Sequence, residues 1–200
     1  MYASNLVFGY GSLMNISNLQ KYLGRNLIPD LDFRFCHLHN FQRCWNIAMD
    51  NSLDLPNYKY YVEPKTGNRP AAFVTFLNVC PIQSQAIMGI LFRVSEKELQ
   101  NLDRRERNYR RIDATNLIDY SINGKAWVYI GLDEAQQRYQ QGLQQSNVMI
   151  AQDYFNSVHH AYYLLGKEAF TNYLATTEKP RVPIVNLKMC QVKSTACQSE

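Results

Sequence analysis

Residues 6–15, LVFGYGSLMN, contain the first residue types suited to chemistry. A strand-forming apolar run gives way to a loop with Gly9 and Gly11 two positions apart, and a helical pattern follows. Glycine at such a turn allows positive φ angles or a close approach to a ligand, so backbone N–H groups can bind a carboxylate or an oxyanion. With Ser12, this loop could hold an anionic group. An ordinary strand-to-helix turn capped by Ser12 or Asn15 explains the same residues.

Glu106 is the second residue suited to chemistry. Ser95 and Glu98 form a capping box that predicts the start of a helix. Leu99, Leu102 and Glu106 are three and four positions apart, so they share one stripe of this helix, and Glu106 is expected to face the core. Five arginines surround this acid in the sequence: Arg104, Arg105, Arg107, Arg110 and Arg111.

A carboxyl group in that position is under two opposing influences. Burial favours its protonated form, whereas nearby guanidinium groups favour the ionised form. Such a balance suits a general acid/base, which must take up and return a proton. A structural salt bridge between Glu106 and one of the arginines is the other interpretation, because buried acids are usually paired.

The elements that must position these residues are mainly strands in the first two thirds of the chain. Between them, a short helix is predicted at 16–23, ended by Gly24, and a second helix after the capping box at Ser95. Gly89 marks a bulge, a bend or a close approach to the backbone. The expected strands are 31–48 with a bend at Asn40, 58–62, 71–79, 86–94, 109–117 and 127–130, the last two joined by a turn at Asn123-Gly124.

The remainder of the chain is predicted to be helical. A glutamine-rich polar helix at 136–146 is expected to break at Gly142, and residues 167–176 form a further helix after Gly166. The segment after Pro180 holds one short apolar piece and then frays. Between these lies a one-sided helical stripe formed by Val148, Ala151, Phe155, Val158, Tyr162 and Leu165.

Composition places the chain among soluble intracellular proteins of one domain. It has 200 residues, of which 46% are hydrophobic, and a formal net charge of +4. This charge favours anionic small molecules and is well short of that of a dedicated nucleic-acid binder. No apolar run is long enough to span a membrane, and no secretory leader is evident. A cytoplasmic protein is therefore expected.

Cysteine and histidine give little sign of a metal or disulfide site. The cysteines, Cys36, Cys44, Cys80, Cys190 and Cys197, are odd in number and show no C-x-x-C pair, which favours reduced thiols. His37 and His39 share a strand face, and His159 and His160 point apart on a helix. Neither pair has a nearby acidic or thiol partner, so no metal is expected.

Three motifs in order resemble the γ-glutamylcyclotransferase superfamily. They are the loop Tyr10-Gly11-Ser12-Leu13 after the first strand, the strand motif Gly89-x-Leu91-x-x-Val94, and Leu102-Asp103-x-x-Glu106-x-x-Tyr109. Each motif alone is weak, but their order and spacing are specific, and the resemblance covers residues 5–130. It implies a mixed α+β fold, a small mixed β-barrel of about five to seven strands with flanking helices. We therefore expect one domain over 1–200, with the barrel at 5–131 and C-terminal helices at 136–177.

The resemblance also implies a reaction. Family members cyclise a γ-glutamyl group to 5-oxoproline and release the attached amine or amino acid. In that chemistry the α-amino group of the substrate attacks its own γ-carbonyl carbon, so no enzyme nucleophile, metal or cofactor is needed. By resemblance, Glu106 is the general acid/base, the loop from Tyr10 to Leu13 with Gly11 and Ser12 binds the γ-glutamyl group, and Tyr109 hydrogen-bonds the substrate. A half-buried strand tyrosine is the alternative for Tyr109.

The chain departs from the family pattern in two places. Arg107 and Asn108 stand where members often have glycine between the acid and the tyrosine. Asparagine tolerates a left-handed conformation, and the arginine could pair with a substrate carboxylate. Met14 and Asn15 do not match the continuation of the loop in the glutathione-specific ChaC-like branch.

Two other functions fit parts of the sequence. The first is a binding module that keeps the pocket and holds an anionic small molecule without turnover, although a carboxylate in the pocket would not help it. The second is nucleic-acid binding by the segment DRRERNYRR, whose acidic residues interrupt the arginines. The predicted partner is therefore a small γ-glutamyl substrate, with no nucleic acid or membrane partner, and the protein is a monomer or homodimer.

Overall fold

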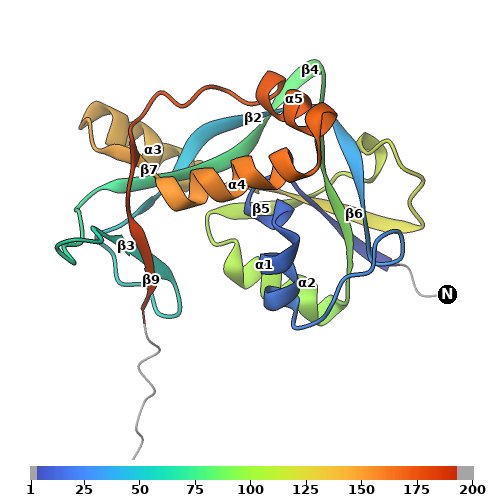
Figure 1. The fold of residues 1–200 in the computed structure, drawn as a ribbon, viewed down its shortest axis with the longest axis horizontal. Coiled ribbons are helices and arrows are strands. Elements are labelled where there is room, and N and C mark those ends of the chain that lie inside the picture. Colours follow the sequence, from blue (N-terminus) through green and yellow to red (C-terminus); the bar gives the residue numbers. More distant parts are fainter. Residues whose placement is uncertain (1–3, 193–200) are drawn as a thin grey trace, which may run out of the picture.

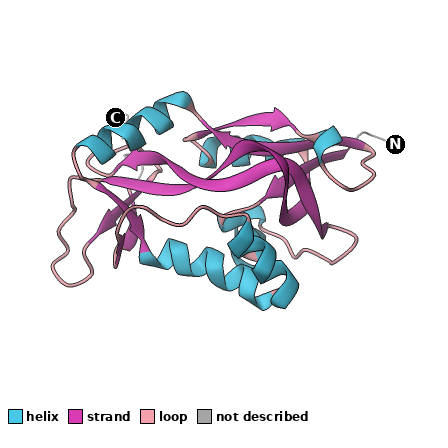
Figure 2. Ribbon diagram, turned by 90° about the horizontal axis from the view of Figure 1, so that it is seen from above, coloured by secondary structure: helices cyan, strands magenta, loops and turns pink. Residues whose placement is uncertain are grey.

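The computed structural model describes residues 4–192 (Figure 1). The helices are α1 (Ile16–Leu23), α2 (Glu96–Arg105), α3 (Asp133–Gln144), α4 (Gln152–Leu164) and α5 (Lys167–Ala175), with the 3₁₀ helices η1 (Ser12–Met14) and η2 (Thr115–Leu117). The strands are β1 (Ser4–Gly9), β2 (Phe33–Asp50), β3 (Lys59–Val62), β4 (Phe73–Val94), β5 (Tyr109–Asp113), β6 (Gly124–Gly131), β7 (Val148–Ala151), β8 (Ile184–Val185) and β9 (Lys188–Gln191). Helices lie on both sides of the layer of strands (Figure 2).

Seven strands form one mixed sheet. Its order is β5-β6-β1-β4-β7-β8, and β2 also pairs with β4. Strand β1 is antiparallel to β4 and parallel to β6, while β3 and β9 form a separate antiparallel pair. The predicted mixed α+β class is confirmed.

The sheet is open and not the closed barrel that the resemblance implied. Among the described residues, the chain after β5 meets β2 through an isolated bridge between Leu38 and Ile118 and through hydrogen bonds between His37 and Asp119, without forming a paired strand. The reason lies just past the end of β5, where the carboxylate of Asp113 accepts a hydrogen bond from the backbone N–H of Thr115 and the chain turns into η2.

Strands β2 and β4 are longer than predicted. They pair along most of their lengths, from Phe33 opposite Phe92 to Asp50 opposite Phe73. The bend expected at Asn40 is present, because Asn40 has a φ of +64° and the register skips beyond His39. Ser84, with a φ of +65°, lies in the matching irregularity of β4. The predicted break between two strands is thus a bulge within one long strand.

The predicted bounds of α1 and the predicted start of α2 are confirmed. Helix α1 is capped by the Asn15 side chain, which accepts from the Asn18 N–H, and it ends at Gly24 in a left-handed conformation. Helix α2 begins with the predicted capping box of Ser95 and Glu98.

Two predictions in the C-terminal third are wrong in detail. Residues 148–151 form strand β7, because Val148 and Met149 pair in parallel with Phe73 and Val74 of β4. Helix α3 does not break at Gly142. A Cβ there would lie 2.4 Å from Cγ2 of Val148, so glycine allows the helix to pack closely on β7.

The end of the described chain is more ordered than predicted. Residues expected to fray after one apolar piece include β8, which pairs with β7, and β9, which pairs with β3. Residues 193–200, to which the predicted fraying also applied, lie outside the described residues. No helix in residues 4–192 is long and apolar enough to cross a membrane.

The cysteine prediction is wrong for two residues. Cys44 of β2 and Cys80 of β4 form a disulfide, because the pairing of these strands brings their backbones together. Cys36 and Cys190 are free, and Cys197 lies outside the described residues. Spacing along the sequence could not show this pair, since the two cysteines are 36 positions apart and meet only through strand pairing.

Candidate active site

The loop after β1 turns sharply because its glycines pack closely. A Cβ at Gly9 would lie 2.6 Å from Cβ of Leu13, and one at Gly11 would lie 3.3 Å from the Tyr154 hydroxyl. Gly11 has a φ of −121°, so close approach, and not a positive φ angle, explains this glycine. The loop continues into η1, which buries Leu13 and Met14.

Two backbone amides of this loop have no protein acceptor. In the described part of the chain, neither Gly11 N–H nor Ser12 N–H donates to another residue, whereas Met14 N–H donates to Gly11 O at 3.0 Å. Such amides are available to bind an oxygen atom of a ligand.

Glu106 lies immediately after helix α2, in its C-cap position. Its backbone N–H donates to Leu102 O at 2.8 Å, while Leu99 and Leu102 on the same stripe are buried in the core. Only 15% of the Glu106 side chain is exposed. The prediction that the acid faces inward therefore agrees with its position.

Arg105 connects the acid to the loop. Its Nη1 atom lies 3.2 Å from Glu106 Oε1, and its Nη2 atom donates to the Ser12 hydroxyl at 3.3 Å. The structural interpretation of Glu106 as an ion-pair partner is thus also realised.

All six residues predicted for the site meet around one cavity. Its volume is about 30 Å³. The lining residues are Phe8, Tyr10, Gly11, Ser12, Leu13, Leu77, Glu106, Tyr109, Tyr129 and Tyr154. The two segments of the chain that carry the candidate chemistry, far apart in sequence, therefore converge, and the roles assigned to their side chains stay predictions.

Two tyrosines hydrogen-bond the backbone of the same residue, Leu77, at this cavity. Tyr109 donates its hydroxyl to Leu77 O at 2.7 Å, and the Tyr154 hydroxyl accepts from Leu77 N–H at 3.2 Å. Burial raises the pKa of both hydroxyls above the ordinary value of 10. Both are therefore neutral at physiological pH, and the hydrogen of Tyr154 remains available to donate into the cavity.

Several lining residues, notably Tyr154 and Tyr129, were not predicted from the sequence. Tyr154 lies three positions after Ala151 and four before Val158, a spacing that could have placed it on the inner face of α4. Tyr129 donates to Asp103 Oδ1 at 2.8 Å, and no local sequence signal indicated this contact.

Asn108 does not play the conformational role expected of it. It is absent from the residues with positive φ, and the turn closes instead through a 2.8 Å hydrogen bond from Tyr109 N–H to Glu106 O. The Asn108 side chain is buried, donates to the Tyr58 hydroxyl at 3.0 Å and accepts from Arg138 at 2.9 Å. Asparagine thus anchors the segment after the acid through its side chain.

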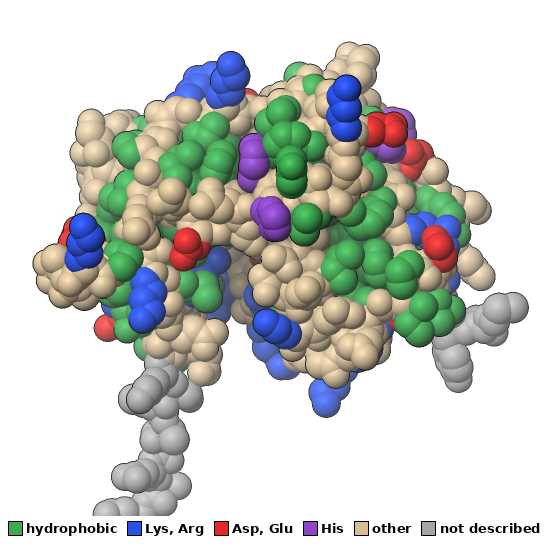
Figure 3. Space-filling model, viewed as in Figure 1, with side chains coloured by type: hydrophobic (Ala, Val, Ile, Leu, Met, Phe, Trp, Pro, Cys, Tyr) green, Lys and Arg blue, Asp and Glu red, His purple; other side chains and the backbone are tan. Residues whose placement is uncertain are grey.

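Basic side chains lie near the carboxylate of Glu106. Lys59 of β3 places its Nζ atom 3.8 Å from the ring centroid of Phe76, which contacts the Tyr154 ring edge-on at 5.0 Å. Burial lowers the pKa of Lys59 to about 8, with Glu106 opposing this shift and Arg105 adding to it. Figure 3 shows a hollow between the β3–β9 pair and helices α1 and α2, with basic side chains on both of its sides.

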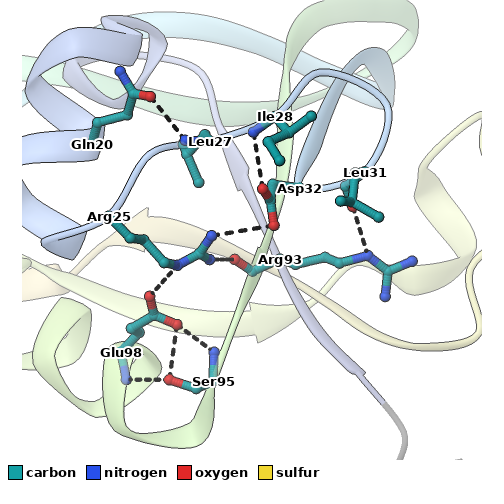
Figure 4. Close-up of polar contacts among 9 residues, drawn as sticks. All are labelled: Gln20, Arg25, Leu27, Ile28, Leu31, Asp32, Arg93, Ser95 and Glu98. Atoms are coloured by element: carbon teal, nitrogen blue, oxygen red, sulfur yellow. Dashed lines mark hydrogen bonds and ion pairs between the residues drawn. The ribbon is translucent and has the colours of Figure 1, made fainter.

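A polar cluster fixes the start of the helix that precedes Glu106. Arg25, just after α1, donates to Glu98 at 2.7 Å, to Asp32 at 3.2 Å and to the Arg93 carbonyl at 2.7 Å (Figure 4). Glu98 also accepts from Ser95 N–H at 2.6 Å. These contacts tie α1, the end of β4 and α2 together, and so orient the helix that precedes the acid.

Metal ligands are not grouped in the described chain. Between residues 4 and 192, no three His, Cys, Asp or Glu side chains lie close enough to hold a metal ion. His37 instead pairs with Asp119, with 2.9 Å between Nδ1 and Oδ2.

An open mixed sheet with helices on both sides defines an α+β protein, and its small cavity brings an inward-facing carboxylate together with free backbone amides. The chain belongs to the family described as Gamma-glutamyl cyclotransferase, AIG2-like, whose model matches residues 7–147. A comparison with curated proteins gave no match.

Solved structures share the fold at low sequence identity. One titled Gamma-glutamyl cyclotransferase is 10% identical with a TM-score of 0.51, over 91% of this chain and 94% of that one. An uncharacterized protein from Homo sapiens is 11% identical with a TM-score of 0.53, over 90% and 94% of the two chains. At these identities the similarity concerns the fold alone.

Proposed function

We propose that this protein cyclises a γ-glutamyl amine or γ-glutamyl amino acid to 5-oxoproline and releases the amine. The observation that carries the proposal is the convergence of Glu106 with the Tyr10–Leu13 loop around one cavity. Family membership supports the reaction class. A carboxylate and free backbone donors are the two kinds of group that this cyclisation requires.

The reaction proceeds without an enzyme nucleophile. The α-amino nitrogen, once deprotonated, attacks the γ-carbonyl carbon and forms a new C–N bond, and the carbonyl oxygen becomes an oxyanion. The carboxylate of Glu106 accepts the proton lost by the attacking nitrogen and gives it to the leaving nitrogen as the original amide bond breaks. Atoms and charges balance without water, metal or cofactor, because one amide is exchanged for another.

Each remaining site residue has a role in this scheme. The N–H groups of Gly11 and Ser12 stabilise the oxyanion, and Tyr10 and Leu13 shape the wall that holds the folded substrate. The hydroxyls of Tyr109 and Tyr154 face the γ-glutamyl group. Because the cavity has a volume of only about 30 Å³, the aromatic side chains must move apart when substrate enters.

The test is a screen of γ-glutamyl amino acids and γ-glutamyl amines, with 5-oxoproline measured by mass spectrometry. Glu106→Gln keeps the shape of the side chain and removes proton transfer, so kcat is expected to fall by about 10²-fold or more, with KM changed little. The matched control is Glu134→Gln, at an exposed glutamate of α3, which should leave kcat unchanged. Near wild-type activity in Glu106→Gln would refute the assignment.

Ser12→Ala separates the hydroxyl of the loop from its amides. We expect a decrease in kcat of less than about 10-fold, because the backbone donors remain. A loss as large as that of Glu106→Gln would instead place Ser12 at the centre of the chemistry.

A binding module without turnover is the second candidate function. The ion pair between Arg105 and Glu106 favours it, because this contact already engages one carboxylate oxygen of Glu106. Calorimetric binding of γ-glutamyl compounds with no 5-oxoproline formed would support this alternative.

Several predictions accompany the proposal. They are a single domain over residues 1–200, a cytoplasmic location, a small-molecule substrate, no nucleic-acid partner, and a monomer or homodimer. The disulfide between Cys44 and Cys80 argues against the cytoplasmic location, because such bonds form most readily in oxidising compartments.

A further inference from the structure

Arg43 of β2 is a charged residue with no exposed surface. Within residues 4–192 no carboxylate lies within ion-pair distance of it. Its guanidinium donates to neutral groups: Nε to Tyr10 O at 3.3 Å, Nη1 to the Thr176 hydroxyl at 2.8 Å, and Nη2 to the Tyr162 hydroxyl at 2.7 Å and to Met88 O. The hydrogen-bond partners of this buried cation are thus carbonyl and hydroxyl oxygens.

Aromatic faces complete the surroundings of this cation. Its Cζ atom lies 4.6 Å from the ring centroid of Tyr162 and 5.5 Å from that of Tyr173. Such contacts recover part of the cost of removing the charge from water, but an apolar residue of similar size would avoid that cost. Stability alone therefore does not account for an arginine at this position.

The contact with Tyr10 connects the cation to the site. The Tyr10 carbonyl oxygen accepts from Arg43 and also lies 3.0 Å from the Tyr162 hydroxyl. Since the Tyr10–Gly11 peptide bond is trans, its N–H points opposite to its C=O. The carbonyl is directed toward the buried Arg43, so the Gly11 N–H is directed away from it, and that N–H has no protein acceptor in the described chain.

We infer that Arg43 and Tyr162 are positioning residues that fix the Tyr10–Gly11 peptide and aim the Gly11 N–H at the oxyanion of the substrate. This inference rests on the proposed function. A positive charge on the carbonyl side also polarises the peptide and makes its N–H a stronger donor. Neither residue touches substrate, because both act from behind the loop.

Tyr162→Phe is the sharpest test, because it removes one hydroxyl and keeps the ring that packs against Arg43. We expect kcat for the best γ-glutamyl substrate to fall by about 10-fold or more with KM changed less than about 3-fold, the pattern of a donor used mainly in the transition state. Tyr173→Phe is the matched control, because this ring stacks on Tyr162 at 4.5 Å and also faces the cation. Equal kcat values in the two variants would overturn the inference.

Arg43 itself is tested with two substitutions. Arg43→Met removes the charge at similar volume, and Arg43→Lys retains a charge without the planar fork of donors. We expect kcat to fall in the order wild type, Arg43→Lys, Arg43→Met among variants whose unfolding transition remains cooperative. If Arg43→Met does not fold, the comparison of Tyr162→Phe with Tyr173→Phe decides.

A readout independent of turnover separates this inference from the proposed function. In ¹H–¹⁵N spectra of the free protein, Tyr162→Phe should shift the Gly11 amide resonance, whereas Tyr173→Phe should leave it close to its wild-type position. If no 5-oxoproline forms but Tyr162→Phe still shifts the Gly11 resonance, the proposed function is refuted and the positioning role of Arg43 and Tyr162 stands. If both variants turn over substrate as wild type does and their Gly11 resonances are identical, the positioning role is refuted and the proposed function stands.

Discussion

Lys59 illustrates how a single partly buried charge near the site affects the stability of the whole protein. Burial lowers its pKa from the ordinary 10.5 to about 8. Between these two values the unfolded chain binds a proton that the folded chain does not. The contribution of Lys59 to the free energy of unfolding therefore rises with pH from about 8 to 10.5, and at pH 7 this residue opposes folding.

Lys59→Met is expected to stabilise the protein at pH 7 by about 1–3 kcal/mol and to lose that advantage by pH 10. Urea unfolding of wild type and variant at both pH values measures the change. Lys188→Met, at an exposed lysine of the neighbouring strand β9, serves as the control and should show no such pH dependence. A constant difference between Lys59→Met and wild type across pH would contradict the burial argument.

Residues of the site differ in how far sequence predicts them. The Tyr10–Leu13 loop and Glu106 are recognisable because each departs from the local pattern: two glycines at a turn, and an acid on an apolar stripe. Tyr154, Lys59 and Arg43 come to the site from α4, β3 and β2, and tertiary packing alone brings them there. Their own sequence neighbourhoods resemble ordinary helix and strand.

At the scale of elements, helix α2 depends on the cluster around Arg25. Burial alone would raise the pKa of Glu98, but hydrogen bonds from Arg25 and Ser95 outweigh it, and the pKa is lowered from 4.5. Because the folded value is below the unfolded one, this contribution to stability is present above pH 4.5 and is lost as pH falls through the folded value.

Arg25→Gln should lower the free energy of unfolding by about 1–2 kcal/mol at pH 7, and by less as the pH falls through the lowered pKa of Glu98 in the folded protein. Urea titrations followed by circular dichroism provide the measurement. Arg104→Gln, at an exposed arginine whose side chain donates to Asn101 of the same helix, is the control. Equal destabilisation by the two variants would mean that the cluster has no special role.

Helices and strands could be predicted from the sequence where a single local signal, such as a helix cap, marks where the element begins or ends. Caps at Asn15 and Ser95 and the left-handed Gly24 placed α1 and α2 correctly. Strand β7 was missed because Val148 and Ala151 fit a helical stripe as well as a buried strand, and four residues are too few to separate the two periods. The open edge next to β5 also depends on a turn at Asp113 and Thr115. The sequence predicted one strand over 109–117, so it did not indicate this turn.

At the scale of the molecule, the Cys44–Cys80 disulfide joins the two longest strands. It closes a loop of 36 positions, so reduction is expected to lower the free energy of unfolding by about 2–4 kcal/mol. Urea unfolding with and without a thiol reductant measures this effect. In the double variant Cys44→Ser, Cys80→Ser the reductant should change nothing, and Cys36→Ser should respond as wild type does. A reductant effect that persists in the double variant would contradict the assignment.

Pairing of β3 with β9 has a consequence for biosynthesis. Residues 59–62 emerge from the ribosome long before residues 188–191, so during translation this edge of β3 has no partner and its contacts close late. Chains stopped upstream of residue 188 would keep a bare strand edge, which is a template for association with other chains. Truncated products of this protein are therefore expected to require chaperones or to aggregate, even when every residue of the cavity has been synthesised.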